Sequence, residues 1–144
     1  MTTVQRSITV NAAPETIETY SRYAGSWPDW FPGVVGVNVD DTYPDVGSAA
    51  QVAFQAAGTT FELTLVVLDY VPGERVEYEL QGMAHGHASF ILADDGGGQR
   101  VDAQIEYELP GGVLGRIADR TVIEQRVDAA LEEALYNLKV GAEG

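Results

Sequence analysis

Arg120 and Glu124 are the charged residues whose spacing most suggests chemistry. They stand four positions apart near the start of a long predicted helix, on the face that also carries Ile117 and Val127. Side chains at this spacing are neighbours on a helix and form an ion pair. If that face turns inward along the whole helix, the pair lies in or beside the interior and could orient a carbonyl or carboxylate group of a ligand.

A second arrangement of this helix leaves the same pair in water. Leu114, Ala118 and Val122 form another apolar strip on its first half. If this strip turns inward, Arg120 and Glu124 form a solvated ion pair, which contributes only a few tenths of a kcal/mol. The sequence leaves both arrangements open.

Tyr78 and Tyr107 are the other candidates for polar groups in the interior. Each belongs to a run in which apolar and polar residues alternate, so both phenols are predicted on a buried strand face. A buried phenol needs a hydrogen-bond partner, which a ligand can supply. His85 and His87 share the parity of Ser89 and are predicted to point outward, which favours a surface role over metal binding or proton transfer.

Several kinds of site are excluded or not indicated. The chain has no cysteine, which excludes disulfides, thiolate metal sites and a cysteine nucleophile. The glycine run at residues 96–98 predicts a turn rather than a phosphate loop, because no helix start follows it. We therefore expect no cofactor and no metal, and no motif identifies a catalytic residue.

The net charge narrows the range of partners. The chain has 144 residues, with 22 acidic against 8 basic ones, and a formal charge of −14. Such a surface repels phosphate groups, so neither nucleic acid nor an anionic membrane is expected as a partner. The absence of a long apolar run and of a leader peptide predicts a cytoplasmic protein without membrane insertion. Scattered acids with one lysine, Lys139, also suit a high-salt cytoplasm, in which screening removes the self-repulsion.

Hydrophobic periodicity predicts the elements that position these side chains. Alternating apolar residues predict seven strands, and a change of parity at Leu68 predicts a bulge or bend. Two short helices are predicted at residues 14–21 and within 26–33. Residues 113–140 predict a terminal helix roughly 40 Å long, with Val113, Ile117, Val127, Leu131, Ala134, Leu135 and Leu138 on its buried face. Residues 1–144 are expected to form a single domain, as a monomer or a homodimer.

This order of elements resembles the helix-grip fold of the START-like (SRPBCC) superfamily. Particular phrases are similar to its polyketide cyclase/dehydrase and lipid-transport branch: Val10–Ile17, Trp27–Val34, Tyr70–Val76, Leu114–Arg120 and Leu135–Lys139. The resemblance covers essentially the whole chain. It implies an α+β fold in which a seven-stranded curved antiparallel sheet wraps around the C-terminal helix, with two short helices after the first strand.

The resemblance also implies a deep apolar cavity between the sheet and the long helix, which relatives use for lipids, polyketides, quinones or plant hormones. We expect a small hydrophobic ligand there, a lipid, a polyketide or an isoprenoid-like molecule. The residues expected to line its site are Trp30, Phe31, Phe54, Phe61, Leu63, Tyr78, Phe90, Ile105, Tyr107, Leu114, Ile117, Arg120 and Glu124. The alternative is that these apolar side chains simply fill a packed core.

Two further functions fit the same sequence. In one, the cavity folds a reactive chain, and a tyrosine or the Arg120–Glu124 pair moves a proton, as in a cyclase or dehydrase without a cofactor. In the other, the protein is an interaction module, like those relatives that act on a chaperone or ribosome through their surface. An exposed apolar patch would favour the module.

Overall fold

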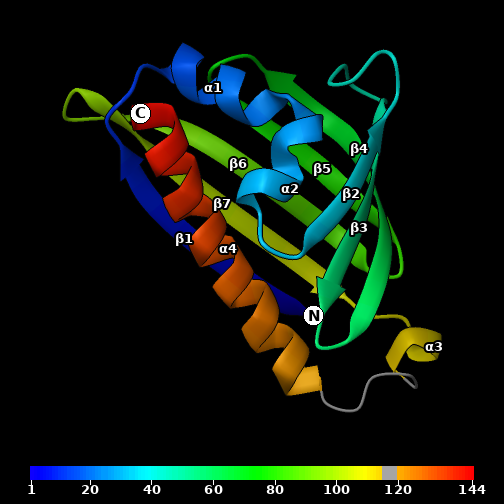
Figure 1. Cartoon of the computed structure of the whole chain (residues 1–144). Helices are drawn as coiled ribbons and strands as arrows, with labels where there is room; N and C mark the ends of the chain where they lie inside the picture. Colours follow the sequence, from blue (N-terminus) through cyan, green and yellow to red (C-terminus); the bar gives the residue numbers. More distant parts are fainter. Residues whose placement is uncertain (115–119) are drawn as a thin grey trace.

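The computed structural model, which describes residues 1–114 and 120–144, contains one antiparallel sheet of seven strands (Figure 1). Its spatial order is β1-β7-β6-β5-β4-β3-β2, so consecutive strands from β2 to β7 are neighbours and β1 closes the far edge. The strands are β1 (Thr2–Val10), β2 (Val34–Val39), β3 (Ala49–Ala56), β4 (Thr59–Val71), β5 (Arg75–Gly82), β6 (His85–Asp95) and β7 (Gly98–Glu108). The predicted strands and their connections are confirmed.

A bulge in β4 changes which of its side chains face inward. The pairing with β5 shifts between Val67 and Asp69, which confirms the irregularity predicted from the parity change at Leu68. Val67 is buried, whereas Leu68 is exposed. Before the bulge the odd-numbered residues face the interior; beyond it the extra residue changes the parity, so even-numbered Tyr70 faces inward.

Two short helices and a 3₁₀ turn follow β1. They are α1 (Pro14–Arg22), η1 (Ala24–Ser26) and α2 (Trp27–Trp30). Proline near the start of α1 is favourable because its missing N–H would have no partner there. Figure 1 shows α1 and α2 in front of the central strands, so these helices close one side of the sheet's concave face.

The C-terminal helix differs from the prediction. It is described as α4 from Arg120 to Glu143, while Val113 belongs to a separate short helix, α3 (Gly111–Leu114). Val113 is nevertheless buried in the core, so its apolar character reflects the packing of α3 and not a first turn of α4. Ile117 and Ala118 lie outside the described residues.

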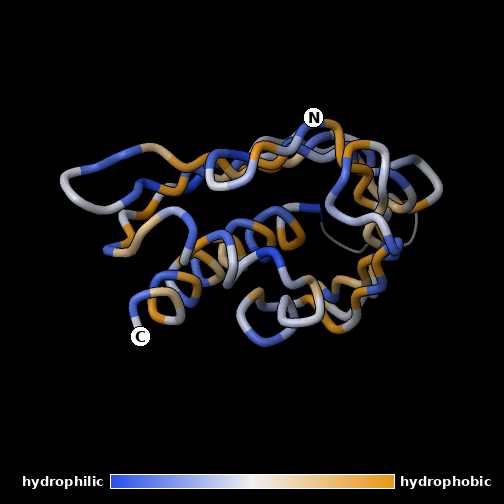
Figure 2. The backbone as a smooth tube through the Cα atoms, turned by 90° about the horizontal axis from the view of Figure 1, so that it is seen from above, coloured by the Kyte–Doolittle hydropathy of each residue, from blue (hydrophilic) through white to orange (hydrophobic). Residues whose placement is uncertain are grey.

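The concave face of the sheet and one face of α4 enclose the core. Along α4 the buried side chains are Ile123, Ala130, Leu131, Ala134, Leu135 and Leu138. Figure 2 shows the sheet on one side and the helices on the other, with the strands at one end curving toward the helices. The predicted buried face from Leu131 to Leu138 is confirmed, and this face of α4 packs into the core on the concave side of the sheet.

Candidate ligand-binding cavity

A cavity of about 210 Å³ lies between the sheet and the helices α1, α2 and α4. Most of its lining is aliphatic or aromatic, and strands β2 to β7 all contribute to it. Nine of the thirteen residues predicted to bind a ligand line this cavity: Trp30, Phe31, Phe54, Phe61, Leu63, Tyr78, Phe90, Ile105 and Tyr107. Seven of them meet there because alternate residues of each strand point to the same face of the sheet, whereas Trp30 and Phe31 come from the end of α2.

The other four predicted residues do not add to the described lining. Ile117 and the side chain of Leu114 lie outside what the structure describes. Arg120 and Glu124 are found at the surface, with 67% and 37% of their side chains exposed and 3.9 Å between Nε and Oε1. Of the two arrangements that the sequence left open, the structure has the solvated ion pair, because α4 is rotated so that neighbouring Ile123, not Glu124, is buried.

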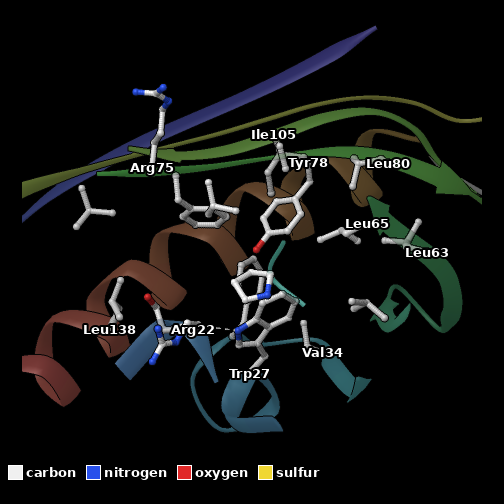
Figure 3. Close-up of a pocket in the computed structure, with 18 of the residues that line it drawn as sticks. Arg22, Trp27, Val34, Leu63, Leu65, Arg75, Tyr78, Leu80, Ile105 and Leu138 are labelled. Atoms are coloured by element: carbon white, nitrogen blue, oxygen red, sulfur yellow. Dashed lines mark hydrogen bonds between the residues drawn. The ribbon is translucent and has the colours of Figure 1, made fainter. Parts of the chain in front are cut away.

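Two phenols form one polar group of the cavity wall. Tyr43, from the loop after β2, and Tyr78, from β5, are joined by a hydrogen bond of 2.6 Å between their hydroxyl oxygens. Trp27 stands edge-on to both rings, with centroid distances of 6.2 and 6.4 Å. Figure 3 shows the Tyr78 hydroxyl projecting from β5 into the cavity toward Trp27. Burial raises the pKa of Tyr43 to about 12 and that of Tyr78 well above 10.0, so both are neutral.

Counting protons shows what this pair offers a ligand. Each phenol has one proton, and one of the two is used in the bond between them. Neither hydroxyl is hydrogen-bonded to any other described residue. The pair therefore keeps one unused O–H donor, and a carbonyl oxygen is the kind of ligand group that would accept it.

A second polar group lies where α1 crosses the end of β4. The Tyr70 hydroxyl donates a hydrogen bond to Glu18 Oε1, and Arg22 Nη1 stands 3.6 Å from Glu18 Oε2. All three residues line the cavity, and the Glu18 side chain is only 18% exposed. Burial, followed by the hydrogen bond to Glu18, raises the pKa of Tyr70, while Arg22 acts in the opposite direction.

Sequence reasoning missed Tyr43, Tyr70, Glu18 and Arg22. Glu18 lies on the helix predicted at residues 14–21 and Arg22 directly follows it, so their four-residue spacing was a visible signal for an ion pair. The spacing did not indicate Tyr70, which is 52 positions from Glu18. Tyr43 stands in a turn-rich stretch without periodicity, so its burial had no local signal.

Tyr107 lies in the wall next to the start of α4. Its hydroxyl is buried and makes no hydrogen bond with good geometry to any described residue. Thr2 approaches it, but the Thr2 hydroxyl donates to Glu124 Oε1 at 3.0 Å instead. Burial and then the charge of Glu124 raise the pKa of Tyr107 to about 12, against smaller opposing effects of Thr2 and Arg120.

His85 and His87 are exposed on β6, as predicted from their parity. Within residues 1–114 and 120–144, no cluster of three or more His, Asp or Glu side chains is arranged to hold a metal ion. Over the same ranges, no helix has the length and apolar character needed to cross a membrane.

Solved structures with the same fold cover nearly the whole chain. TTHA0849 from Thermus thermophilus has a TM-score of 0.81 at 15% identity, over 98% of this chain and 97% of that protein. The Zhui aromatase/cyclase from Streptomyces sp. R1128 has a TM-score of 0.78 at 15% identity, over 99% and 93%. At these identities the similarity shows the fold alone.

A further match concerns part of a larger protein. The di-domain aromatase/cyclase StfQ from the steffimycin biosynthetic pathway has a TM-score of 0.77 at 18% identity, over 98% of this chain and 50% of that protein. The chain thus spans half the length of StfQ. No curated protein sequence matches this chain.

A family profile matches nearly the whole chain. The profile described as polyketide cyclase / dehydrase and lipid transport matches residues 1–143. The match extends from the first residue of the chain to the end of α4, and thus includes every described element that lines the cavity. The sequence, the helix-grip architecture and this match agree, and the chain belongs to the polyketide cyclase / dehydrase and lipid transport family.

Proposed function

We propose that this protein binds a small, neutral, mostly apolar ligand with a carbonyl oxygen, of the polyketide type, in the cavity between the sheet and α4. The observation that carries the proposal is the Tyr43–Tyr78 pair, whose hydroxyls are 2.6 Å apart and retain one unused proton. An apolar cavity with a few placed polar groups is the usual form of a small-molecule site. A carbonyl oxygen satisfies the unused donor without bringing a charge into the interior.

The charges at the cavity edge favour a neutral ligand over a carboxylate. Arg22 is paired with Glu18 at 3.6 Å, and Arg75 with Asp69 at 2.7 Å. Figure 3 shows the Arg75 guanidinium directed away from the cavity. A carboxylate would therefore enter an apolar space without a free cation among the described lining residues, in a protein with a net charge of −14. Burying an unpaired charge is strongly unfavourable.

The family description includes both polyketide cyclases and lipid transport, and two other observations favour the polyketide class over a single-chain lipid. Two of the similar structures are described as aromatase/cyclases, and one of these belongs to a named biosynthetic pathway. Ten of the residues that line the cavity are aromatic, which suits flat ring systems that stack or pack edge-on. The interaction module remains a prediction from the sequence.

Binding of two matched bicyclic compounds tests the proposal. β-Tetralone carries a carbonyl group that tetralin lacks, and quenching of Trp27 and Trp30 fluorescence reports on binding because both side chains line the cavity. A variant with both Tyr43→Phe and Tyr78→Phe removes the donor without leaving an unpaired hydroxyl. We expect it to weaken β-tetralone roughly three- to tenfold, since a hydrogen bond contributes about 0.5–1.5 kcal/mol.

The controls separate carbonyl recognition from a general change of the cavity. Tetralin should bind the double variant as well as the unaltered protein, and tetralin carboxylate should bind both weakly. Tyr23→Phe alters a tyrosine that is 72% exposed and should change none of these affinities. Equal loss of β-tetralone and tetralin in the double variant, or no binding of either compound to the unaltered protein, would contradict the proposal.

A further inference from the structure

The Glu18–Tyr70–Arg22 group has a composition suited to moving a proton. A phenol in the cavity wall donates its hydrogen bond to a carboxylate, and an arginine lies next to both. Among the described lining residues, the only other carboxylate is Glu74, which is exposed. Glu18 is thus the one largely buried carboxylate in the described part of this wall.

Tyr70 and the Tyr43–Tyr78 pair can contact the same ligand. Tyr70 pairs with Val76 across β4 and β5, and Tyr78 follows Val76 by two residues on the same face. With strands about 4.8 Å apart and a rise of about 3.3 Å per residue, the Cα atoms of the two tyrosines are roughly 8 Å apart. Tyr70 is also close enough to influence the ionisation of both Tyr43 and Tyr78. A bicyclic ligand is large enough to contact both groups at once.

We infer that Tyr70 and Glu18 form a proton relay that removes a proton from the carbon next to the carbonyl group of the bound ligand. The inference rests on the proposed function, because it requires a ligand whose carbonyl oxygen accepts from Tyr43 or Tyr78. The reaction class is enolisation, the step that prepares a carbon atom for ring closure or for loss of water.

The step balances within the groups present. The ligand C–H bond breaks and its proton passes to the Tyr70 oxygen, while the Tyr70 proton passes to Glu18 Oε1. The electron pair left on carbon forms a C=C bond, and the carbonyl π electrons move to the ligand oxygen. That oxygen becomes the enolate oxygen, and it accepts a hydrogen bond from the unused phenolic O–H of the Tyr43–Tyr78 pair without taking its proton. Tyr70 ends neutral and Glu18 ends protonated.

Each of the three residues has a distinct role in this step. Tyr70 is the catalytic residue, because it lines the cavity and receives the proton from the ligand. Glu18 is the proton acceptor behind it, and its partial exposure lets the proton exchange with water afterwards. Arg22 is a positioning residue, because it stands beside Oε2 and leaves Oε1 to Tyr70.

Deuterium exchange into β-tetralone tests the relay. In deuterated buffer, the protons next to the carbonyl group are replaced by deuterium each time the enolate forms, and proton NMR measures the rate with protein in excess. Binding is measured in the same samples through tryptophan fluorescence. General acid–base groups contribute about 10²- to 10⁴-fold, so Glu18→Gln and Tyr70→Phe should each slow the protein-dependent exchange at least about 100-fold.

Glu15→Gln is the matched control, because Glu15 is an exposed acid one turn away on the same helix. It makes the same change of charge and should leave exchange unaltered. Glu18→Gln retains an oxygen that accepts from Tyr70, so its affinity for β-tetralone should stay within about twofold of the unaltered protein. A merely structural contact would lose affinity or thermal stability without a selective loss of exchange.

The outcomes separate this inference from the proposed function. If β-tetralone binds but exchanges no faster than in buffer, or if Glu18→Gln exchanges as fast as the unaltered protein, the relay is wrong and the binding function stands. If β-tetralone does not bind, both are wrong. Should Glu18→Gln fail to fold, Tyr70→Phe alone decides, since it retains the ring and the Glu18–Arg22 pair.

Discussion

The hydroxyls of Tyr43 and Tyr78 lie in a mostly apolar wall, where each is the other's hydrogen-bond partner. Transfer of a hydroxyl from water to an apolar environment without a hydrogen bond costs about 1–3 kcal/mol in protein mutants. The bond of 2.6 Å offsets this cost for one proton and leaves the other unused. A polar pair that is only partly satisfied is expected at a functional site, where a ligand supplies the missing partner.

The raised pKa of Tyr43 predicts a loss of stability at alkaline pH. The phenol ionises near 10.0 in the unfolded chain and at about 12 in the folded protein. Its stabilising contribution is therefore complete below pH 10 and is lost as the pH rises toward 12, at about 1.4 kcal/mol per pH unit. Between about pH 9 and about pH 11, Tyr43→Phe should lose roughly 1 kcal/mol less of its free energy of unfolding than the unaltered protein.

Urea unfolding at the two pH values measures this difference. Tyr23→Phe serves as the control, because it removes a phenol that is 72% exposed and should reproduce the loss seen in the unaltered protein. Equal losses in Tyr43→Phe and the unaltered protein would show that Tyr43 ionises as readily in the folded state as in the unfolded chain.

At the scale of elements, the strands β6 and β7 approach each other closely beside the cavity. Gly86 pairs with Leu80 on one side and with Tyr107 on the other, and both of these residues line the cavity. A Cβ atom at Gly86 would stand 1.9 Å from the carbonyl oxygen of Glu106, and its φ of 153° is one that L side chains rarely adopt. Only glycine fits at this point without separating the strands.

Gly86→Ala should therefore destabilise the protein by at least about 2 kcal/mol and weaken β-tetralone binding, because backbone rather than a movable side chain must give way. Gly36→Ala is a matched control on another strand, since the nearest atom to its added Cβ is Ala53 Cβ at 4.0 Å. Its free energy of unfolding should stay within about 0.5 kcal/mol of the unaltered value. Similar urea midpoints for the two variants would contradict this account of the β6–β7 contact.

At the scale of the whole molecule, acidic side chains outnumber their possible partners. Eight basic residues face 22 acidic ones, so most of the acids cannot be paired. The ion pairs that do form are largely at the surface, such as Arg6 with Asp128 at 2.6 Å. Exposed pairs contribute little, whereas repulsion among the unpaired acids acts over the entire surface.

Stability should therefore rise with salt. Screening shortens the range of the repulsion from about 30 Å at 0.01 M to about 3 Å at 1 M ionic strength. Salt also weakens the surface ion pairs, but the stabilisation lost there is smaller than the destabilising repulsion that is removed. We expect the midpoint of thermal unfolding to increase steadily between these two sodium chloride concentrations. A midpoint that falls would show that the ion pairs outweigh the repulsion and would contradict adaptation to a high-salt cytoplasm.

Hydrophobic periodicity was sufficient to predict the sheet and the buried face of the second half of α4. Alternation along a strand is a local property, so residues such as Phe61, Tyr78 and Ile105 could be placed on the inner face without knowledge of the fold. The same reasoning predicted seven of the nine cavity residues, because inward-facing side chains of a curved sheet converge on one space.

Tertiary structure alone decided the polar groups of the cavity. The rotation of α4 buries Ile123 in place of Glu124, which depends on packing against the sheet and not on the helix's own pattern. Tyr43 reaches Tyr78 across 35 positions, and Tyr70 reaches Glu18 across 52. The amino-acid sequence determined which faces are apolar, since burial follows local periodicity. The chemistry of the site depended on long-range contacts, which periodicity does not encode.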